Sequence, residues 1–174
     1  MANTYTLIAS STVGSGGAAS IDFTSIPSTY TDLVIKLSIR TTRASIIDYG
    51  AMRFNSDSGS NYSARYLQGF SGAASSSTNG NATQLEIPNA LNGDTSTANT
   101  FNNAEIYIPN YAGSNQKSVS FDAVTENNAT DAITMLQAGK WSGTAAITSM
   151  TIYSANGFNF KQYSTAYLYG VKNA

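Results

Sequence analysis

The chain has 174 residues, the length of a single domain (1–174), and 41% of them are hydrophobic, which is enough to form a buried core. Only 11% are charged and the net charge is −1, without any basic stripe, which excludes the electrostatic pattern of a nucleic-acid-binding protein. Cysteine and histidine do not occur, which excludes disulfides, thiol chemistry and the common zinc sites.

The N-terminal sequence MANTYTLIASS lacks both the basic segment and the long apolar segment of a signal peptide. No apolar run approaches the about 18 residues that a transmembrane helix needs. We therefore expect a protein that is made in a cytoplasm and does not enter a membrane. Its low net charge weakens self-repulsion and favours association with itself or with a larger assembly.

Short segments with alternating apolar and polar residues recur from the start of the chain, and this period of two predicts half-buried strands. Segments 4–12 and 19–23 flank the glycine-rich turn 14–17, and we expect them to form a hairpin. Segment 32–41 has the cleanest alternation and is expected to be a central strand. Its two faces carry Leu33, Ile35, Leu37 and Ile39 on one side and Val34, Lys36, Ser38 and Arg40 on the other.

The middle of the chain is richer in small polar residues. Segments 49–54 and 61–68 are predicted strands on either side of the polar turn 55–60. Segment 71–82 consists almost only of Gly, Ala, Ser, Thr and Asn, and we expect an exposed loop because it has nothing to bury. A short strand at 84–87, ended by Pro88, and a polar loop at 89–99 are expected to follow.

Segment 103–127 contains two alternating strands joined by the turn-prone residues 110–116, which predicts an antiparallel pair. Segment 132–141 fits a helix or a strand, and Gly139 together with the all-β surroundings favours a strand. The last predicted strands are 147–153 and 165–171, and we expect the first and last strands to be tied into the sheets. About ten short strands without a convincing helix predict an antiparallel β-sandwich or jelly roll.

The candidates for chemistry are few. Ser-His-Asp and Cys-His arrangements are impossible without histidine and cysteine. Asp122 and Glu126 are the closest pair of carboxylates on a predicted strand, and such pairs hydrolyse glycosides only inside a cleft. They are more simply interpreted as residues of a solvated face, so we expect no catalytic residue. The glycines of 14–17 are not followed by a helix or a lysine, which argues against a phosphate-binding loop.

The turn FNSDSGSNY offers Asn55, Asp57 and Asn61 as oxygen ligands for calcium. Ser60 stands where a calcium loop needs its glycine, and Tyr66 stands where it needs a bidentate glutamate. These two departures favour an ordinary turn rich in Asx residues, so we expect neither a metal nor another cofactor.

The tyrosines allow two interpretations. They could line a carbohydrate-binding platform, or they could be buried between subunits, where an apolar ring with a polar tip is favoured. The residues in question are Tyr107, Tyr111, Tyr153, Tyr163, Tyr167 and Tyr169.

Five motifs in order, RFNSDSGSNYSARYLQG (53–69), AEIYIPNYAGSNQKSVS (104–120), ENNAT (126–130), the single Trp141 and YLYGVKN (167–173), resemble a family of tailed-bacteriophage virion proteins. The opening of the chain is similar too. The resemblance implies a non-enzymatic, oligomeric virion component with a β-sandwich or jelly-roll fold and no catalytic residues.

Without a repetitive fibre shaft or a separate attachment domain, the chain is closer to a capsid decoration or cement protein than to a fibre. We therefore expect a homotrimer that binds the major capsid protein on the outer surface of the virion and stabilises the shell. The alternative is a tail or fibre appendage subunit that recognises a host glycan through exposed aromatic residues.

Overall fold

The computed structural model describes residues 4–128 and 130–172, so the ends of the chain and Ala129 of the ENNAT motif lie outside the described part. Every regular element that it describes is a β-strand, and it describes no helix long and apolar enough to cross a membrane. The strands are β1 (Tyr5–Thr12), β2 (Ser20–Phe23), β3 (Asp32–Ser38), β4 (Ile47–Phe54), β5 (Tyr62–Phe70), β6 (Ala73–Ala82), β7 (Leu85–Asn92), β8 (Asn103–Ile108), β9 (Lys117–Val124), β10 (Ile133–Trp141), β11 (Met150–Ser154) and β12 (Thr165–Val171).

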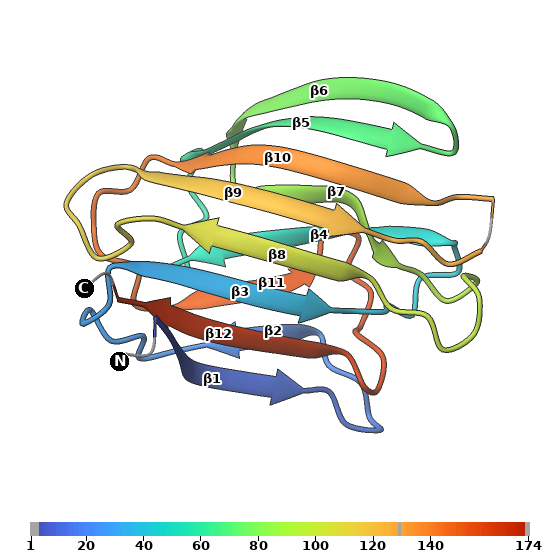
Figure 1. Cartoon of the computed structure of the whole chain (residues 1–174), viewed down its shortest axis with the longest axis horizontal. Helices are drawn as coiled ribbons and strands as arrows, with labels where there is room; N and C mark the ends of the chain where they lie inside the picture. Colours follow the sequence, from blue (N-terminus) through green and yellow to red (C-terminus); the bar gives the residue numbers. More distant parts are fainter. Residues whose placement is uncertain (1–3, 129, 173–174) are drawn as a thin grey trace.

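Two antiparallel sheets form the layers of a sandwich (Figure 1). The large sheet has eight strands in the order β1-β12-β3-β8-β9-β10-β5-β6, and the small sheet has four in the order β2-β11-β4-β7. Without the hairpins β5–β6 and β9–β10, the remaining eight strands alternate between two sheets of four in the order of a jelly roll. The predicted antiparallel β-sandwich is therefore confirmed, with a jelly-roll strand order.

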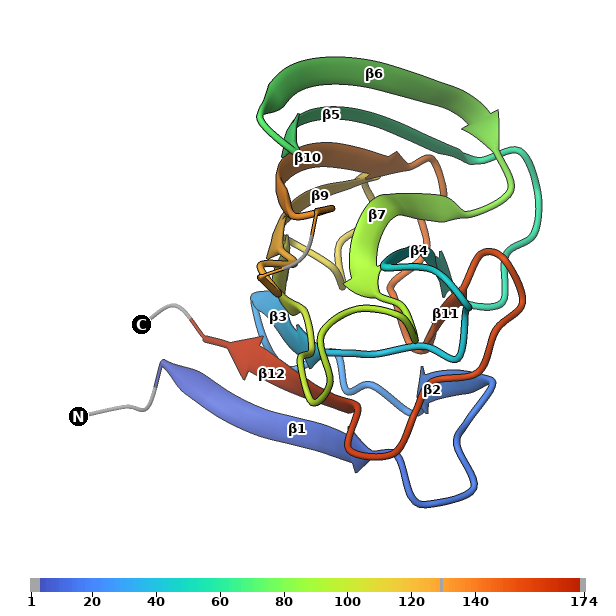
Figure 2. The same ribbon diagram turned by 90° about the vertical axis from the view of Figure 1, so that its right-hand side faces the viewer.

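The two inserted hairpins lie side by side and extend the large sheet beyond β8 (Figure 2). Their inner face packs on β7 of the small sheet. Gly139 of β10 makes this approach possible, because a Cβ atom there would lie 2.6 Å from the Cδ1 atom of Leu85. The glycine in this strand thus marks a close contact between the layers.

Alternation along the strands explains which face is buried. In β9 and β10 every second side chain is buried and the others are exposed, as the period of two requires. β3 departs from this pattern, because Val34 is fully buried as well as its neighbours Leu33 and Ile35. Val34 lies between Tyr169 and Tyr107 on the adjacent strands, where these two larger side chains flank it.

Several predicted pairings are confirmed. β8 and β9 form the antiparallel pair expected in 103–127, and segment 132–141 contains the strand β10. β3 is central, between β12 and β8, and β1 pairs with β12, so the first and last strands are tied into one sheet.

The predicted opening hairpin is wrong. β1 pairs with β12 of the large sheet, whereas β2 pairs with β11 of the small sheet. Between them the chain crosses from one layer to the other along the segment that precedes β12. Val13 donates a backbone hydrogen bond to the Ser164 carbonyl at 2.8 Å, and Ala18 donates one to the Phe160 carbonyl at 3.1 Å.

The exposed loop predicted at 71–82 is also wrong, because this segment contains the ten-residue edge strand β6. Its side chains are almost all exposed, as expected, but its backbone pairs with β5 from Phe70–Ala73 to Tyr62–Ala82. Backbone hydrogen bonds to one neighbour therefore hold this strand without any hydrophobic face.

The short strand predicted at 84–87 is longer than expected. β7 continues through Pro88 to Asn92, and Ala90, Leu91 and Asn92 are buried, so the polar loop predicted at 89–99 is wrong for its first residues. Proline is tolerated because Pro88 lies on the edge strand of the small sheet, at an irregularity where the pairing with β4 passes from Ile87 to Leu91.

We expect Leu37→Ala to lower the free energy of unfolding by about 2–5 kcal/mol, because Leu37 is buried in the core and its truncation leaves a cavity. Ser76→Ala on the exposed edge strand β6 is the control, with a change of less than about 0.5 kcal/mol. Urea denaturation of both variants measures the difference, and equal midpoints would contradict the assignment of the core.

Candidate functional site

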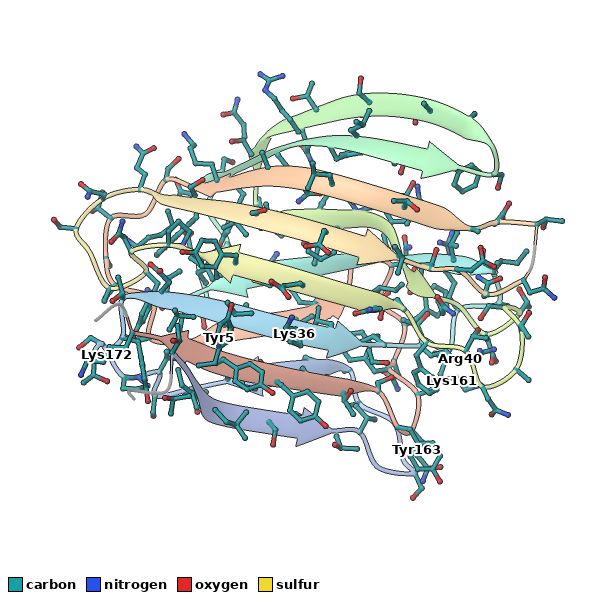
Figure 3. The ribbon with its side chains drawn as sticks, viewed as in Figure 1. Tyr5, Lys36, Arg40, Lys161, Tyr163 and Lys172 are labelled. Atoms are coloured by element: carbon teal, nitrogen blue, oxygen red, sulfur yellow. The ribbon has the colours of Figure 1, made fainter. Side chains whose placement is uncertain are left out.

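Exposed apolar side chains gather on the outer face, which is the face of the large sheet that points away from the small sheet (Figure 3). Contiguous exposed apolar surface on a folded protein marks a place where another surface binds. The exposed large side chains on this face are Tyr5, Leu7, Leu67, Tyr107, Val124, Leu136 and Tyr167.

One end of the outer face carries the tyrosine group, which we define as Tyr5, Leu7, Tyr107, Tyr167 and Tyr169. The rings of Tyr5 and Tyr169 meet edge to face, with their centroids 6.3 Å apart. The Tyr107 hydroxyl donates a 2.8 Å hydrogen bond to the buried Asp32 carboxylate, and this bond raises the pKa of Tyr107. The group is therefore ordered before any partner binds.

The other end carries the leucine groove, a depression of about 680 Å³ over β9, β10, β5 and β6. Leu136 of β10 and Leu67 of β5 lie directly opposite each other, and their exposed fractions are 59% and 58%. Polar side chains such as Arg65, Thr78 and Ser120 also line the groove. The groove offers two leucine side chains to a partner on the strands that the inserted hairpins add.

A charged row separates the tyrosine group from the leucine groove. Lys36, Glu105 and Asp122 are cross-strand neighbours on β3, β8 and β9. The Lys36 ammonium donates a hydrogen bond to Glu105, which raises the pKa of Lys36. Burial raises the pKa of Asp122, and the adjacent Glu105 charge adds to this effect. The row fixes three charges between two apolar areas.

The outer face of the small sheet is different, because its polar groups are paired with one another. The Tyr153 hydroxyl donates to Gln84 Oε1 at 2.7 Å, and the Arg53 guanidinium lies 5.5 Å from the centre of the Tyr153 ring. Thr151 donates to the Asp22 carboxylate at 2.6 Å. None of the exposed large apolar side chains of the described residues lies on this face.

Only three of the six tyrosines considered for a carbohydrate-binding platform lie together on one face. Tyr107, Tyr167 and Tyr169 share the outer face, as a platform requires. Tyr111 is fully buried, and its hydroxyl donates a hydrogen bond to the Pro27 carbonyl inside the protein. Its place in the list of candidate site residues is therefore wrong.

The other two tyrosines lie elsewhere. Tyr153 belongs to the small sheet. Tyr163 lies in the turn before β12, at one end of the sandwich, with 67% of its surface exposed. The interpretation of all six tyrosines as one platform is wrong, because Tyr153 lies on the other sheet and Tyr111 and Tyr163 lie in loops.

The two carboxylates proposed as a pair are not brought together as a catalytic pair. Asp122 points outward from β9 beside Glu105, whereas Glu126 lies beyond the end of that strand. The Glu126 carboxylate accepts a 2.7 Å hydrogen bond from the Asn128 backbone amide within its own loop.

The residues considered as calcium ligands, Asn55, Asp57 and Asn61, form hydrogen bonds within the protein. Asn55 accepts from the backbone amides of Thr148 and Ser149 at 2.9 and 3.2 Å. Asp57 accepts from the Gly59 amide, the Asn61 side chain and the Trp141 indole at 2.8, 2.9 and 2.7 Å. These bonds fix the turn between β4 and β5 against Trp141. The described residues contain no cluster of three or more acidic side chains that would hold a metal ion.

Sequence reasoning missed Leu67 and Leu136. Both stand at positions where the alternation of β5 and β10 turns a side chain outward, so a leucine there departs from the apolar-in, polar-out rule. In segment 132–141, Leu136 also fits a helical face with Ile133 and Lys140, and this is why the segment fits a helix as well as a strand. Their position opposite each other depends on the pairing of strands about 70 positions apart in sequence, which local patterns do not give.

The comparisons with known proteins add no relative: no family model and no curated protein matches this sequence.

We expect Asp57→Ala to destabilise the fold by about 1–3 kcal/mol at neutral pH, because the buried Trp141 indole N–H loses its acceptor. The indole hydrogen bond holds the pKa of Asp57 below its ordinary value of 3.8. Its contribution is therefore present above that value and is lost as the pH falls through the folded-state pKa. Thermal unfolding followed by Trp141 fluorescence should show a difference between the two proteins that narrows on acidification. A difference that stays constant would contradict this role.

Proposed function

We propose that this chain is a non-enzymatic structural protein of a phage virion, a capsid decoration or cement protein that attaches to the shell through its outer face. The observation that carries the proposal is the outer face itself. It presents the tyrosine group and the leucine groove on one side of a rigid two-layered sandwich, while the small sheet presents paired polar groups.

The outer face suits a protein partner better than a small molecule. Its exposed apolar side chains are spread over six of the eight strands of the large sheet, from β1 to β5, which is an extended area. Full burial of a leucine side chain contributes roughly 1.5–3 kcal/mol, and tyrosine adds a large ring whose hydroxyl can bond to a group of the partner. The charged row between the two apolar areas would set the orientation of the partner, because an unpaired charge is costly to bury.

The resemblance to virion proteins supplies the identity of the partner. Under this proposal the outer face binds the major capsid protein, and the chain belongs to the virion after synthesis in the host cytoplasm. Many copies on one shell would add their weak contacts through avidity. Attachment across neighbouring capsid subunits would stabilise the shell.

The leucine groove is expected to be required for attachment. Leu67→Ser combined with Leu136→Ser should weaken capsid binding by at least about tenfold, because burial of each leucine contributes more than the about 1.4 kcal/mol that a tenfold change requires. Both side chains are exposed, so the thermal midpoint should change little. Co-sedimentation with mature capsids of its own virus measures binding.

Phe158→Ser is the matched control, because Phe158 is also an exposed apolar residue but lies in the loop after β11, outside the outer face. Capsid binding of this variant should equal that of the unaltered protein. Equal binding by all three proteins, or labelling of the tail instead of the shell in electron micrographs, would contradict the proposed attachment.

Self-association is a second part of the proposal, with a homotrimer as the expected form. The edge strand β6 has ten residues without a single charge, and an open uncharged edge invites pairing unless it is covered. Contact between copies would cover it, and closed symmetry would stop further growth. Native mass spectrometry should show three times the 18.3 kDa chain.

Ala74→Lys combined with Ser75→Lys places two charges on this exposed edge, outside the leucine groove. We expect these charges to convert the trimer into monomers that keep the thermal midpoint of the fold, since lysine on an edge strand blocks pairing. A monomeric unaltered protein, or a trimer that survives both lysines, would contradict the proposed role of β6.

A further inference from the structure

A cleft of about 390 Å³ opens at one end of the sandwich, away from the outer face. One wall is the loop between β7 and β8, and the other is the turn before β12. Arg40, Lys161 and Tyr163 mark this end in Figure 3. The residues that matter for its chemistry are Asp94, Asn99, Phe101, Lys161, Gln162 and Tyr163.

Both walls are fixed to one buried residue, Arg40, which follows β3. Its guanidinium donates hydrogen bonds of 2.7–3.0 Å to four backbone carbonyls of the first wall, those of Asp94, Ser96, Thr97 and Thr100. Its own carbonyl accepts the Lys161 amide of the second wall at 2.8 Å. Lys161 and Asp94 also form an ion pair across the opening. The cleft is therefore shaped before a ligand arrives.

Tyr163 is held in a strained conformation at the edge of this cleft. Its φ angle is +72°, in the left-handed region that bulky residues rarely adopt. The residue has 67% of its surface exposed, so side-chain packing does not offset the strain. Strain of this kind persists where the surroundings enforce it and often marks a functional position. A glycine would satisfy the backbone better, but it would remove the ring.

The lining combines an open aromatic ring with groups that both donate and accept hydrogen bonds. The ring of Tyr163 offers an apolar face to C–H groups, and the amides of Asn99 and Gln162 are exposed beside it. The charges of Asp94 and Lys161 cancel each other, and the Arg40 guanidinium is occupied by carbonyls. The cleft therefore presents no unpaired charge to a ligand, and one stacking face with several polar groups fits a polyhydroxylated neutral ligand.

We infer that this cleft binds a neutral saccharide, with one sugar ring stacked on Tyr163 and its hydroxyls bonded to the Asp94, Lys161, Asn99 and Gln162 side chains. This site goes beyond capsid attachment and shares no residue with the tyrosine group or the leucine groove. A protein bound to a shell through its outer face would leave the cleft open to solvent.

The test is saturation-transfer difference NMR with the full chain and the methyl glycosides of glucose, galactose, mannose and N-acetylglucosamine. At least one glycoside should bind, with the strongest transfer to protons of one face of its ring. Tyr163→Gly should weaken that binding about tenfold or more, as loss of a stacking ring does, and should raise the thermal midpoint by relieving strain. Tyr163→Phe should keep the binding.

Two further variants complete the design. Tyr5→Ala removes an exposed tyrosine of the outer face and should leave saccharide binding unchanged. Gln162→Ala changes an exposed amide of the cleft, keeps the backbone as it is and should weaken binding, which tests the site independently of the glycine variant.

Absence of binding by all four glycosides would overturn the inference, and so would binding that persists in both Tyr163→Gly and Gln162→Ala. Capsid co-sedimentation of Tyr163→Gly should equal that of the unaltered protein. Failure of the saccharide site and failure of capsid attachment are therefore told apart by different variants and different measurements.

Discussion

The hydrogen bonds of the buried Arg40 guanidinium hold the loops at one end of the sandwich in place. A charge removed from water needs partners, and here four backbone carbonyls of a single loop provide them instead of a carboxylate. Ser164 adds a reciprocal pair of 3.1 Å bonds to the Arg40 backbone. Strand β3, the β7–β8 loop and the turn before β12 are thus one unit, although they are distant in sequence.

Lys117 is a second buried cation whose partners are backbone carbonyls, and it lies at the opposite end of the large sheet, at the start of β9 (Figure 1). It is fully buried at the start of β9, and its ammonium donates to the Gly113 carbonyl at 2.7 Å and to the Asn115 carbonyl. Burial lowers the pKa of Lys117, and the carbonyl dipoles stabilise the charged form. A chain with few charges therefore uses two of its cations to fix loops, which leaves the sheets themselves to hydrophobic packing.

The strands that bury one face were predictable, and the strand order was not. Alternation in 32–41 and in 103–127 located β3, β8 and β9, because burial of every second side chain leaves a trace in the sequence. β6 leaves no such trace, since only backbone hydrogen bonds to β5 hold it. The pairing of β1 with β12 joins residues more than 150 positions apart, which local patterns cannot specify.

The candidate sites were also predictable only in part: the sequence indicates residue types, whereas the fold decides which residues lie together. Tyr107, Tyr167 and Tyr169 were predicted as candidates from their residue type, but their common face depends on the pairing of β8, β3 and β12. The cleft beside Tyr163 depends on Arg40, whose side-chain bonds no local pattern gives.

In this jelly-roll architecture, the sheet faces and the loops at the ends suit different kinds of binding partner. An extended sheet face with regularly spaced side chains suits another protein surface, whereas loops at an end can enclose a small molecule. Rigid attachment of both loops to one arginine lets this end keep a strained Tyr163 exposed, which a freely moving loop would relax.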